Sequence, residues 1–334
     1  MNGGAAAPPR LWKMGGQVVS LDEKCSRCRR DAEITLRYAG QSLCRQHFIR
    51  FFDARVLRTV RKYRMLEKGS LVAVGLSGGK DSTVMLHLLC KISKSLPIRL
   101  VAITIDEGIA GYRPHTLSVA KRECGKLGVP LRVFSFKKLY GKTLDALLGE
   151  KGVERACSFC GVMRRDALNR AAREVGADRL AIGHNADDVA QTVMMNYMRN
   201  EPERLWRFAP VSGLVEEKAL AKRIKPLFAT PERDIAAYAM MKGIGVHFQE
   251  CPYANSAFRQ HVRSMLNATE EKYPATKMRI VRAFLSQLGP MQSAARKNLA
   301  KDGKGKIGRC GICGEPASGK GKTCSLCRML KAEG

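Results

Sequence analysis

An α/β fold built on a doubly wound parallel sheet, with a small cysteine-rich module near each end, is what this 334-residue sequence predicts. Short apolar runs that are typical of strands alternate with amphipathic runs that are typical of helices. This alternation favours a parallel sheet with helices on both faces. One apolar run ends abruptly in a Gly-rich turn, and cysteines gather in quartets near both ends.

The Gly-rich turn lies in the segment Leu71–Ser82, with the sequence LVAVGLSGGKDS. Its first part, Val72–Leu76, is too short and too β-branched for a helix and predicts a buried strand. The run that follows, Thr83–Ile92, is amphipathic and has good helix-starting residues before it. The segment therefore predicts a strand, an anion-binding loop and a helix.

Two glycines in that turn, Gly78 and Gly79, let the backbone bring its N–H groups against a phosphate, and the helix N-terminus adds a positive potential. The segment is not a Walker A loop, because Asp81 stands where that motif needs Ser or Thr. It resembles the SGGxDS loop of the ATP pyrophosphatases, which cleave ATP between its α- and β-phosphates. That resemblance implies an ATP site made of Ser77, Gly78, Gly79, Lys80, Asp81 and Ser82. The alternative, an ordinary strand-to-helix turn, is disfavoured by the complete hexapeptide.

The charge balance predicts a polyanionic partner. The sequence carries 59 Lys and Arg residues against 30 Asp and Glu residues, a formal net charge of +29. Nucleic acid is the simplest partner for such an excess. Neither a long apolar stretch nor an N-terminal signal region is present, so we expect a soluble, cytoplasmic protein.

The remaining elements follow from the same patterns. Further strands are predicted at Arg99–Ile105, Pro130–Phe136 and Arg179–Gly183. Helices are predicted at Asp53–Glu67, Thr116–Leu127, Ala156–Val175 and Ala186–Met198, and another begins at Thr230 with Pro231 in its first position. We expect a disordered N-terminus over residues 1–20, a zinc finger over 21–52, a PP-loop ATP pyrophosphatase domain over 53–295, and a basic linker with a zinc ribbon over 296–334.

Most of the 12 cysteines form metal-ligand patterns, since disulfides are rare in a reducing compartment. The N-terminal quartet consists of Cys25, Cys28, Cys44 and His47, and the C-terminal quartet of Cys310, Cys313, Cys324 and Cys327. Both are closed four-ligand sets at the spacing of structural zinc sites, so we assign both to scaffolding. Cys90 and Cys124 fall in apolar helical patterns and are expected to be buried.

Two further loops are expected beside the Gly-rich turn, because the carboxyl ends of parallel strands meet at one edge of the sheet. They are Asp106–Arg113, with the sequence DEGIAGYR, and Gly183–Asp188, with the sequence GHNADD. Carboxylates beside phosphates are unfavourable unless a magnesium ion or a proton-transfer role offsets the repulsion. Asp188 is the candidate for binding magnesium or transferring a proton, and a plain helix cap is the alternative for Asp187 or Asp188.

Three other cysteines form a separate set. Cys157 and Cys160 open a predicted helix beside this edge, and Cys251 lies far downstream in Glu250-Cys251-Pro252. Three thiols suit a redox pair with a spare thiol, or a cubane iron–sulfur cluster with one iron left free. Spacing alone leaves that choice open.

The order of these motifs, from Cys25 to about Cys327, resembles that of the TtuA/NcsA/Ctu family of tRNA 2-thiouridine synthetases. The resemblance implies ATP-dependent adenylation of the C2 oxygen of a tRNA uridine, followed by sulfur transfer with a [4Fe-4S] cluster held by Cys157, Cys160 and Cys251. It implies magnesium and two zinc ions. It also implies further ATP contacts from Ile105, Arg164 and Gly183, and catalytic roles for Lys80, Asp81, Asp188 and Arg164.

DEGIAGYR and GHNADD are similar to the branch of the family that acts on the wobble uridine of the anticodon. The branch that acts on the T-loop uridine has a Lys where this sequence has Arg164, and an Arg can clamp phosphate bidentately. We therefore expect the wobble uridine as the target. The resemblance implies tRNA as substrate, a ubiquitin-like sulfur-carrier protein or inorganic sulfide as sulfur donor, and a homodimer or a heterodimer with a paralogue.

Other functions stay open from the sequence. One is a T-loop 2-thiouridine synthetase, and another is a cluster-free persulfide enzyme in which Cys157 and Cys251 form a disulfide pair. A third is a different RNA-modifying ATP pyrophosphatase, such as a lysidine-forming or cytidine-thiolating enzyme. The last is a zinc-containing RNA-binding protein with a decayed loop, which the complete SGGKDS sequence disfavours.

Overall fold

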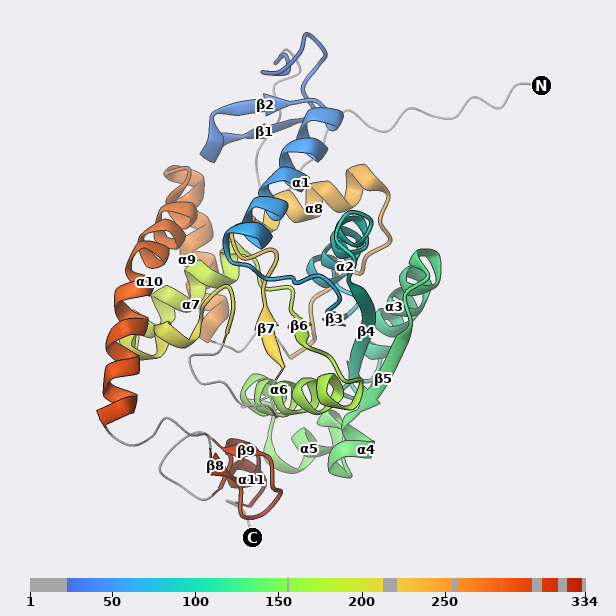
Figure 1. Cartoon of the computed structure of the whole chain (residues 1–334), viewed down its shortest axis with the longest axis vertical. Coiled ribbons are helices and arrows are strands. Elements are labelled where there is room, and N and C mark those ends of the chain that lie inside the picture. The colour runs from blue at the N-terminus through green and yellow to red at the C-terminus, as the bar shows by residue number, and fades with distance from the viewer. Residues whose placement is uncertain are drawn as a thin grey trace, which may run out of the picture.

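The computed structural model of the protein describes residues 23–154, 156–212, 221–253, 258–301, 308–317 and 323–331. Its central sheet has five parallel strands in the order β5-β4-β3-β6-β7, with helices on both faces (Figure 1). The strands are β3 (Leu71–Gly75), β4 (Arg99–Asp106), β5 (Leu131–Ser135), β6 (Arg179–Ala181) and β7 (Lys222–Ile224). The predicted doubly wound parallel sheet is confirmed.

Strand β3 lies in the middle of the sheet, where the strand order reverses. The chain passes from β3 to β4 and β5 on one side, and then returns to β6 and β7 on the other. Val72, Ala73 and Val74 are completely buried, as expected of a parallel strand that is covered on both faces. Ligands bind at the carboxyl ends of the strands beside such a reversal, which is where the Gly-rich turn follows β3.

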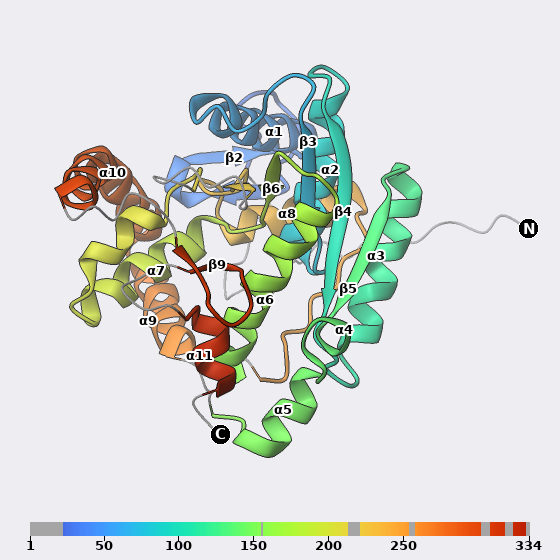
Figure 2. The same cartoon turned by 60° about the horizontal axis from the view of Figure 1, so that its bottom comes forward.

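Helices surround this sheet (Figures 1 and 2), and they pack in three hydrophobic cores. The core on one face includes α1 (Arg45–Lys62), α2 (Lys80–Ser93), α3 (Arg113–Leu127) and α8 (Glu232–Lys242). The core on the other face includes α4 (Phe136–Tyr140), α5 (Leu144–Lys151) and α6 (Ala156–Glu174). The third core joins α7 (Ala186–Met198), the 3-10 helix η2 (Pro202–Arg207), α9 (Phe258–Lys272) and α10 (Thr276–Lys301).

A small cysteine-rich module is fixed to each face. The N-terminal module consists of β1 (Ile34–Leu36), the 3-10 helix η1 (Arg37–Ala39) and β2 (Gln41–Leu43), and it continues into α1. Phe52 of α1 stacks on Tyr238 of α8 with the ring centroids 4.2 Å apart. The C-terminal module consists of β8 (Gly308–Arg309), β9 (Pro316–Ala317) and α11 (Ser325–Lys331). Its Glu315 pairs with Arg173 of α6 at 2.6 Å, so α6 carries this module.

Most of the predicted elements are confirmed with slightly shifted ends, but some differ. The bounds of the predicted helix Asp53–Glu67 are wrong, because α1 begins inside the N-terminal module and ends at Lys62. Pro231 is the N-cap of α8 and not its first helical residue. Strand β7 and helix α10 lack a sequence prediction, because β7 has three residues and α10 carries Pro290 inside it.

Helices α1 and α10 cross the two predicted domain boundaries, at residues 52/53 and 295/296. The predicted disordered segment 1–20 and most of the Lys- and Gly-rich linker lie outside the described residues. Among the helices of the described part of the chain, none combines the length and the apolar character that a membrane span requires.

Candidate active site at the carboxyl edge of the sheet

Three loops meet at the carboxyl edge of the sheet, as the sequence predicts. Arg113, after β4, donates from Nη1 to the carbonyl oxygen of Ser77 in the Gly-rich turn at 3.0 Å. Asn185, after β6, donates from Nδ2 to Asp81 Oδ1 at 3.2 Å. Gly183 lies close to the same place, because a Cβ at this position would be 3.1 Å from a backbone nitrogen of α2.

The Gly-rich turn has the backbone that its glycines predict. Gly78 has a φ angle of 85°, and a Cβ at this position would lie 2.2 Å from the carbonyl oxygen of Thr116, so only glycine fits. Ser82 Oγ accepts from the Ser77 N–H at 3.1 Å, and the His247 N–H donates to the Gly78 carbonyl oxygen at 3.2 Å. The turn is therefore held from both sides with the N-terminus of α2 behind it, an arrangement that binds phosphate.

Lys80, the first residue of α2, lies between two carboxylates. Its Nζ is 3.1 Å from Asp81 Oδ2 and 2.6 Å from Glu232 Oε1. Burial lowers the pKa of Lys80, but Asp81 and Glu232 outweigh burial and raise it, so the ammonium group is charged. Burial also raises the pKa of Asp81. Sequence reasoning missed Glu232, which it assigned only to the start of a helix.

Both acidic residues of GHNADD cap helices. Asp188 Oδ2 accepts from the Asn185 N–H at 3.1 Å, and Asn185 Oδ1 accepts from the Asp188 N–H at 3.0 Å, a reciprocal capping box at the start of α7. Asp187 Oδ2 accepts from the Glu232 N–H at 2.7 Å at the start of α8. Burial raises the pKa of Asp188 to about 6. The helix-cap alternative thus describes both residues, and a catalytic role for Asp188 stays a prediction.

Cys157, Cys160 and Cys251, hereafter the cysteine centre, converge beside these loops. Cys157 and Cys160 lie in the first turns of α6. Cys157 Sγ donates to the Tyr253 carbonyl oxygen at 3.4 Å, which brings the segment of Cys251 against the start of the helix. Burial is the main cause that raises the pKa of Cys160 to about 11, and the nearby thiols Cys251 and Cys157 contribute to this rise. Three converging thiols are the donor set of a cubane cluster with three protein ligands, so these residues fit such a group.

A chain of polar contacts connects the Gly-rich turn to the cysteine centre. Arg113, which holds the Ser77 carbonyl oxygen, has its Nε 2.9 Å from Glu107 Oε2. Arg164 Nε donates to Glu107 Oε1 at 2.7 Å, and Arg164 Nη2 donates to Cys160 Sγ at 3.2 Å. The side chain of Glu107 is only 4% exposed, whereas that of Arg164 is 45% exposed. Glu107 and Cys160 thus hold Nε and Nη2 of Arg164, while the partly exposed side chain stays accessible to an anion.

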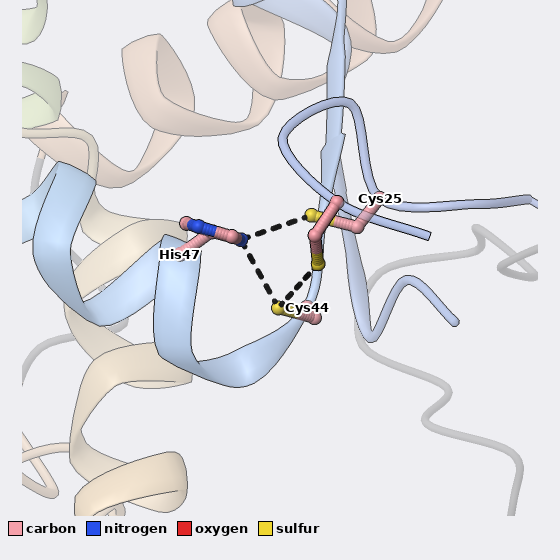
Figure 3. A group of neighbouring side chains, drawn as sticks. Cys25, Cys44 and His47 are labelled. Carbon is pink, nitrogen blue, oxygen red and sulfur yellow. Dashed lines mark hydrogen bonds between the residues drawn. The ribbon is translucent and has the colours of Figure 1, made fainter. Parts of the chain in front are cut away.

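The N-terminal quartet forms a closed ligand set (Figure 3). His47 Nδ1 lies 3.4 Å from both Cys25 Sγ and Cys44 Sγ, and Cys28 Sγ lies 3.9 Å from Cys44 Sγ. Burial opposes ionisation of Cys25, but backbone N–H groups, that of Cys44 first, outweigh it and lower the pKa of Cys25 to about 6. Four close ligand atoms with an ionisable thiol can hold a metal ion, and zinc prefers this set.

The C-terminal quartet forms a second closed set. Cys313 Sγ lies 3.6 Å from Cys324 Sγ, and the Cys324 N–H donates to Cys310 Sγ at 3.2 Å. The backbone N–H groups of Cys324 and Cys313 lower the pKa of Cys310 to about 6. With Cys327, all four sulfur atoms lie within 4.8 Å of one another. Both predicted quartets are therefore assembled by the fold and can bind metal.

The other predicted residues take ordinary structural places. Ile105 is buried, and its carbonyl oxygen accepts from Arg113 Nη2 at 2.5 Å, so its contact with ATP stays a prediction. Cys124 is buried as expected, and Cys90 is partly buried against the same core. Sequence reasoning also missed Glu107, although its place in DEGIAGYR, directly after a strand, put it at the correct edge.

Comparison with known proteins identifies two matching families. Residues 52–270 match the PP-loop domain, and residues 24–49 match the family described as "2-thiouridine synthetase TtuA, N-terminal LIM domain". The PP-loop match begins within α1 and includes all five strands of the sheet and the cysteine centre.

Several characterised proteins are similar over nearly the whole chain. The cytoplasmic tRNA 2-thiolation protein 1 of Bos taurus is 38% identical over 92% of this chain and 87% of its own length. The protein of the same name from Anopheles gambiae is 35% identical over 92% and 87%. A solved structure, the U34-tRNA thiolase NcsA from Methanococcus maripaludis with its [4Fe-4S] cluster, is 33% identical with a TM-score of 0.77, and the match covers 95% of this chain and 98% of that chain.

Proposed function

Since the chain belongs to the tRNA 2-thiouridine synthetase family that includes the cytoplasmic tRNA 2-thiolation proteins and NcsA, we propose that it is an ATP-dependent tRNA sulfurtransferase. It converts the wobble uridine of the anticodon to 2-thiouridine and forms AMP and pyrophosphate. The contact chain from the Gly-rich turn to the cysteine centre carries this proposal, because it joins an ATP site to a sulfur-handling site. The name of NcsA, a U34-tRNA thiolase, favours the wobble position over the T-loop.

The first step takes place on the Gly-rich turn. Backbone N–H groups and the N-terminus of α2 hold the ATP phosphates. The uridine O2 attacks the α-phosphate, and the bond to the β-phosphate breaks, so pyrophosphate leaves. Lys80 offsets the charge that develops on the phosphates, while Asp81 or Asp188 would hold a magnesium ion or accept a proton. The base has to leave its stack to reach this place.

The second step replaces the adenylated oxygen by sulfur. A nucleophilic sulfur forms a bond to C2, and the C2–O bond breaks with AMP as the leaving group, so no net electron transfer is needed. Cys157, Cys160 and Cys251 would hold the [4Fe-4S] cluster, which when bound supplies an iron coordination position without a protein ligand. Arg164 offers its accessible guanidinium to the phosphate of the departing AMP.

The test of this function is reconstitution without oxygen. The purified protein is analysed for iron, sulfide and zinc, and then incubated with ATP, magnesium, sulfide and unmodified tRNA before nucleoside analysis. We expect cluster absorbance and 2-thiouridine at the wobble position. A colourless protein that still thiolates would show that sulfur reaches C2 without the cluster. Loss of ATP cleavage and of thiouridine despite a full cluster would contradict the proposal, whereas T-loop thiouridine would select the other branch.

Glu107→Gln is expected to lower kcat for thiolation by about 10- to 100-fold, with a smaller effect on KM for ATP. The neutral amide keeps the shape of the side chain but no longer holds the charged guanidinium groups of Arg113 and Arg164, which approach the carboxylate at 2.9 and 2.7 Å. Removing one partner of a buried ion pair also destabilises the fold by about 3–5 kcal/mol. Steady-state kinetics and thermal unfolding measure the two effects separately.

Glu250→Gln is the matched control for this variant. Glu250 precedes Cys251 in the chain and pairs with Arg263 at 2.5 Å, but its side chain is 47% exposed. An exposed pair contributes only about 0–1 kcal/mol, so we expect wild-type kcat within about threefold. Equal losses in the two variants would show that the buried link has no special role.

His47→Ala is expected to remove one of two zinc ions from the purified protein. The C-terminal quartet would keep its metal ion, whereas the N-terminal quartet would retain only three thiols. We expect lower stability, because the module is fixed to α8 through α1. Metal analysis and calorimetry provide the measurements, and an unchanged zinc content would refute the assignment of His47 as a ligand.

The metal-binding modules and basic helices are proposed to hold the tRNA body through phosphates and shape. The surface hollow beside the N-terminal quartet is lined by Lys24, Arg29, Arg30 and Arg45 together with the carboxylates of Asp31 and Glu33. We propose the domain limits 21–52, 53–295 and 296–334, a cytoplasmic location like that in the relatives' names, and a dimer. The sulfur donor is a ubiquitin-like carrier or inorganic sulfide.

A further inference from the structure

Four basic side chains gather around His184 at the β6 and β7 end of the carboxyl edge. They are Arg165 of α6, Arg223 of β7, Lys225 directly after β7, and Arg259 of α9, hereafter the basic cluster. The charges of all four act on His184. They therefore converge on one place from three separate segments, next to the loops that form the proposed active site.

The contacts within the basic cluster are made mostly to uncharged groups. Arg223 Nη2 donates to the Arg165 carbonyl oxygen at 3.1 Å and to Asn169 Oδ1 at 2.6 Å. Lys225 Nζ donates to a carbonyl oxygen and lies 5.1 Å from the centroid of the Phe208 ring. Arg165, Arg223 and Lys225 have no carboxylate partner within the described residues.

Asp188 is the acidic group at the edge of the cluster. Its Oδ1 lies 3.5 Å from Arg259 Nη1, while its Oδ2 caps α7. The other contacts of Arg259 are neutral, since Nη1 donates to Gln191 Oε1 and Nη2 to Thr192 Oγ1, both at 3.2 Å. Among the described residues, Asp188 is thus the one carboxylate that pairs with a member of the basic cluster.

Burial first, and the neighbouring positive charges in addition, lower the pKa values of these groups. Burial and then Lys225, Arg259, Arg223 and Arg165 lower the pKa of His184 to about 3. Burial, with Arg223 in addition, lowers the pKa of Lys225 to about 7, and burial with Arg165 lowers that of Arg223 to about 10. Like charges that are partly desolvated repel each other, so a bound anion would stabilise this arrangement.

We propose that the basic cluster is a subsite for a phosphate group of the RNA backbone next to the target nucleotide. This inference rests on the proposed function and adds the place where the RNA strand is held. The ATP phosphates belong on the Gly-rich turn, whereas Arg165 lies within the electrostatic reach of Cys160 in the cysteine centre. A base that is turned out toward that centre carries its flanking phosphates into the adjacent surface. Arg165 and Arg259 are accessible enough to contact them.

The test measures binding without catalysis. The ligand is an anticodon stem-loop RNA with an unmodified wobble uridine, titrated in the absence of ATP over a series of salt concentrations. Arg165→Gln and Arg223→Gln are each expected to weaken binding by about tenfold and to reduce the slope of log K against log salt by about 0.7. Arg165→Gln carries little risk of misfolding, because Arg165 is exposed and none of the ion pairs above involves its side chain.

Arg99→Gln is the matched control. Arg99 is a strand arginine like the cluster's Arg223, but it is exposed, begins β4 and so lies at the opposite, amino-terminal edge of the sheet. We expect its affinity for the stem-loop and its salt slope to stay close to those of the wild type. Equal losses of affinity in all three variants would mean that only the net charge of the protein matters, and this would overturn the subsite.

A second RNA identifies the phosphate itself. A stem-loop with one uncharged methylphosphonate beside the wobble uridine should bind the wild type about tenfold more weakly than the unmodified stem-loop does. Arg165→Gln should bind both RNAs with the same affinity. Independent, additive losses would overturn the assignment. Unchanged RNA binding by Arg165→Gln, together with weaker inhibition of ATP cleavage by inorganic pyrophosphate, would also overturn it. That result would assign the basic cluster to the pyrophosphate leaving group of ATP. Binding is read without thiolation, so failure of the proposed reaction would leave this result interpretable.

Discussion

Gly78→Ala is expected to lower ATP-dependent AMP formation by about 100-fold or more. The added Cβ would lie 2.2 Å from the Thr116 carbonyl oxygen, a backbone atom that cannot move aside as a flexible side chain would. The φ angle of 85° at this position is also unfavourable for alanine. The turn would therefore shift away from α3, and a displacement of about 1 Å in a phosphate-binding loop can cost about 100-fold in rate.

Two other glycines separate the possible causes of that loss. Gly128 has a φ angle of 65° at the end of α3, and a Cβ there would meet nothing within 4 Å. Gly128→Ala thus carries the same type of backbone strain without a clash, and we expect nearly normal activity with a loss of about 1 kcal/mol in stability. If both variants lost activity equally, strain rather than the position of the turn would be responsible.

Gly79→Ala reports on the ligand. In the protein without ATP, a Cβ at Gly79 would meet only Ser77 Oγ, at 3.5 Å, which is an ordinary contact. The turn should therefore keep its shape and the protein its stability. A loss of ATP affinity in this variant would show that the phosphates approach the backbone of Gly79 closely. Calorimetric titration with a non-hydrolysable ATP analogue measures the ATP affinity, and AMP formation measures the activity.

The sequence could predict those parts of the site that depend on local pattern and on the rules of parallel sheets. The strand before Gly78 is continuously apolar, and the helix after it is amphipathic, so the turn between them was fixed at the edge of the sheet. Loops after β4 and β6 had to lie at the same edge, and contacts from Arg113 and Asn185 confirm this. The two metal-ligand quartets could also be predicted from the sequence, because each consists of two closely spaced pairs.

Residues that act through long-range contacts could not be predicted from local pattern. Glu232 reads as an ordinary first residue of a helix, and only the fold brings it within 2.6 Å of Lys80. Glu107 is fixed at the end of a strand by its sequence, but its two arginine partners come from different helices. Likewise, nothing near Cys251 in the sequence shows that its segment returns to the start of α6. The family resemblance supplied that ligand.

Cys251→Ala is expected to abolish thiolation, with a loss of about 1000-fold or more, while ATP cleavage on the Gly-rich turn continues. The reason is that Cys251 belongs to the cysteine centre, whereas the turn is built from β3, α2 and their neighbours. The measurements are iron content, pyrophosphate formation and 2-thiouridine formation on the same preparation, because pyrophosphate leaves in the first step and AMP only when sulfur replaces it. Cys90→Ala is the control, because Cys90 only packs against a hydrophobic core and its loss should affect stability alone.

Comparison of all three cysteines decides between the cluster and a persulfide pair. Cys157 is exposed, whereas Cys160 is 9% exposed and accepts a hydrogen bond from Arg164. Three ligands of one cluster act as a unit, so alanine at Cys157, Cys160 or Cys251 should remove iron and thiolation to the same extent. A persulfide relay between Cys157 and Cys251 needs only those two thiols. Full thiolation by Cys160→Ala, with Cys157→Ala and Cys251→Ala inactive, would therefore exclude the cluster and select the relay.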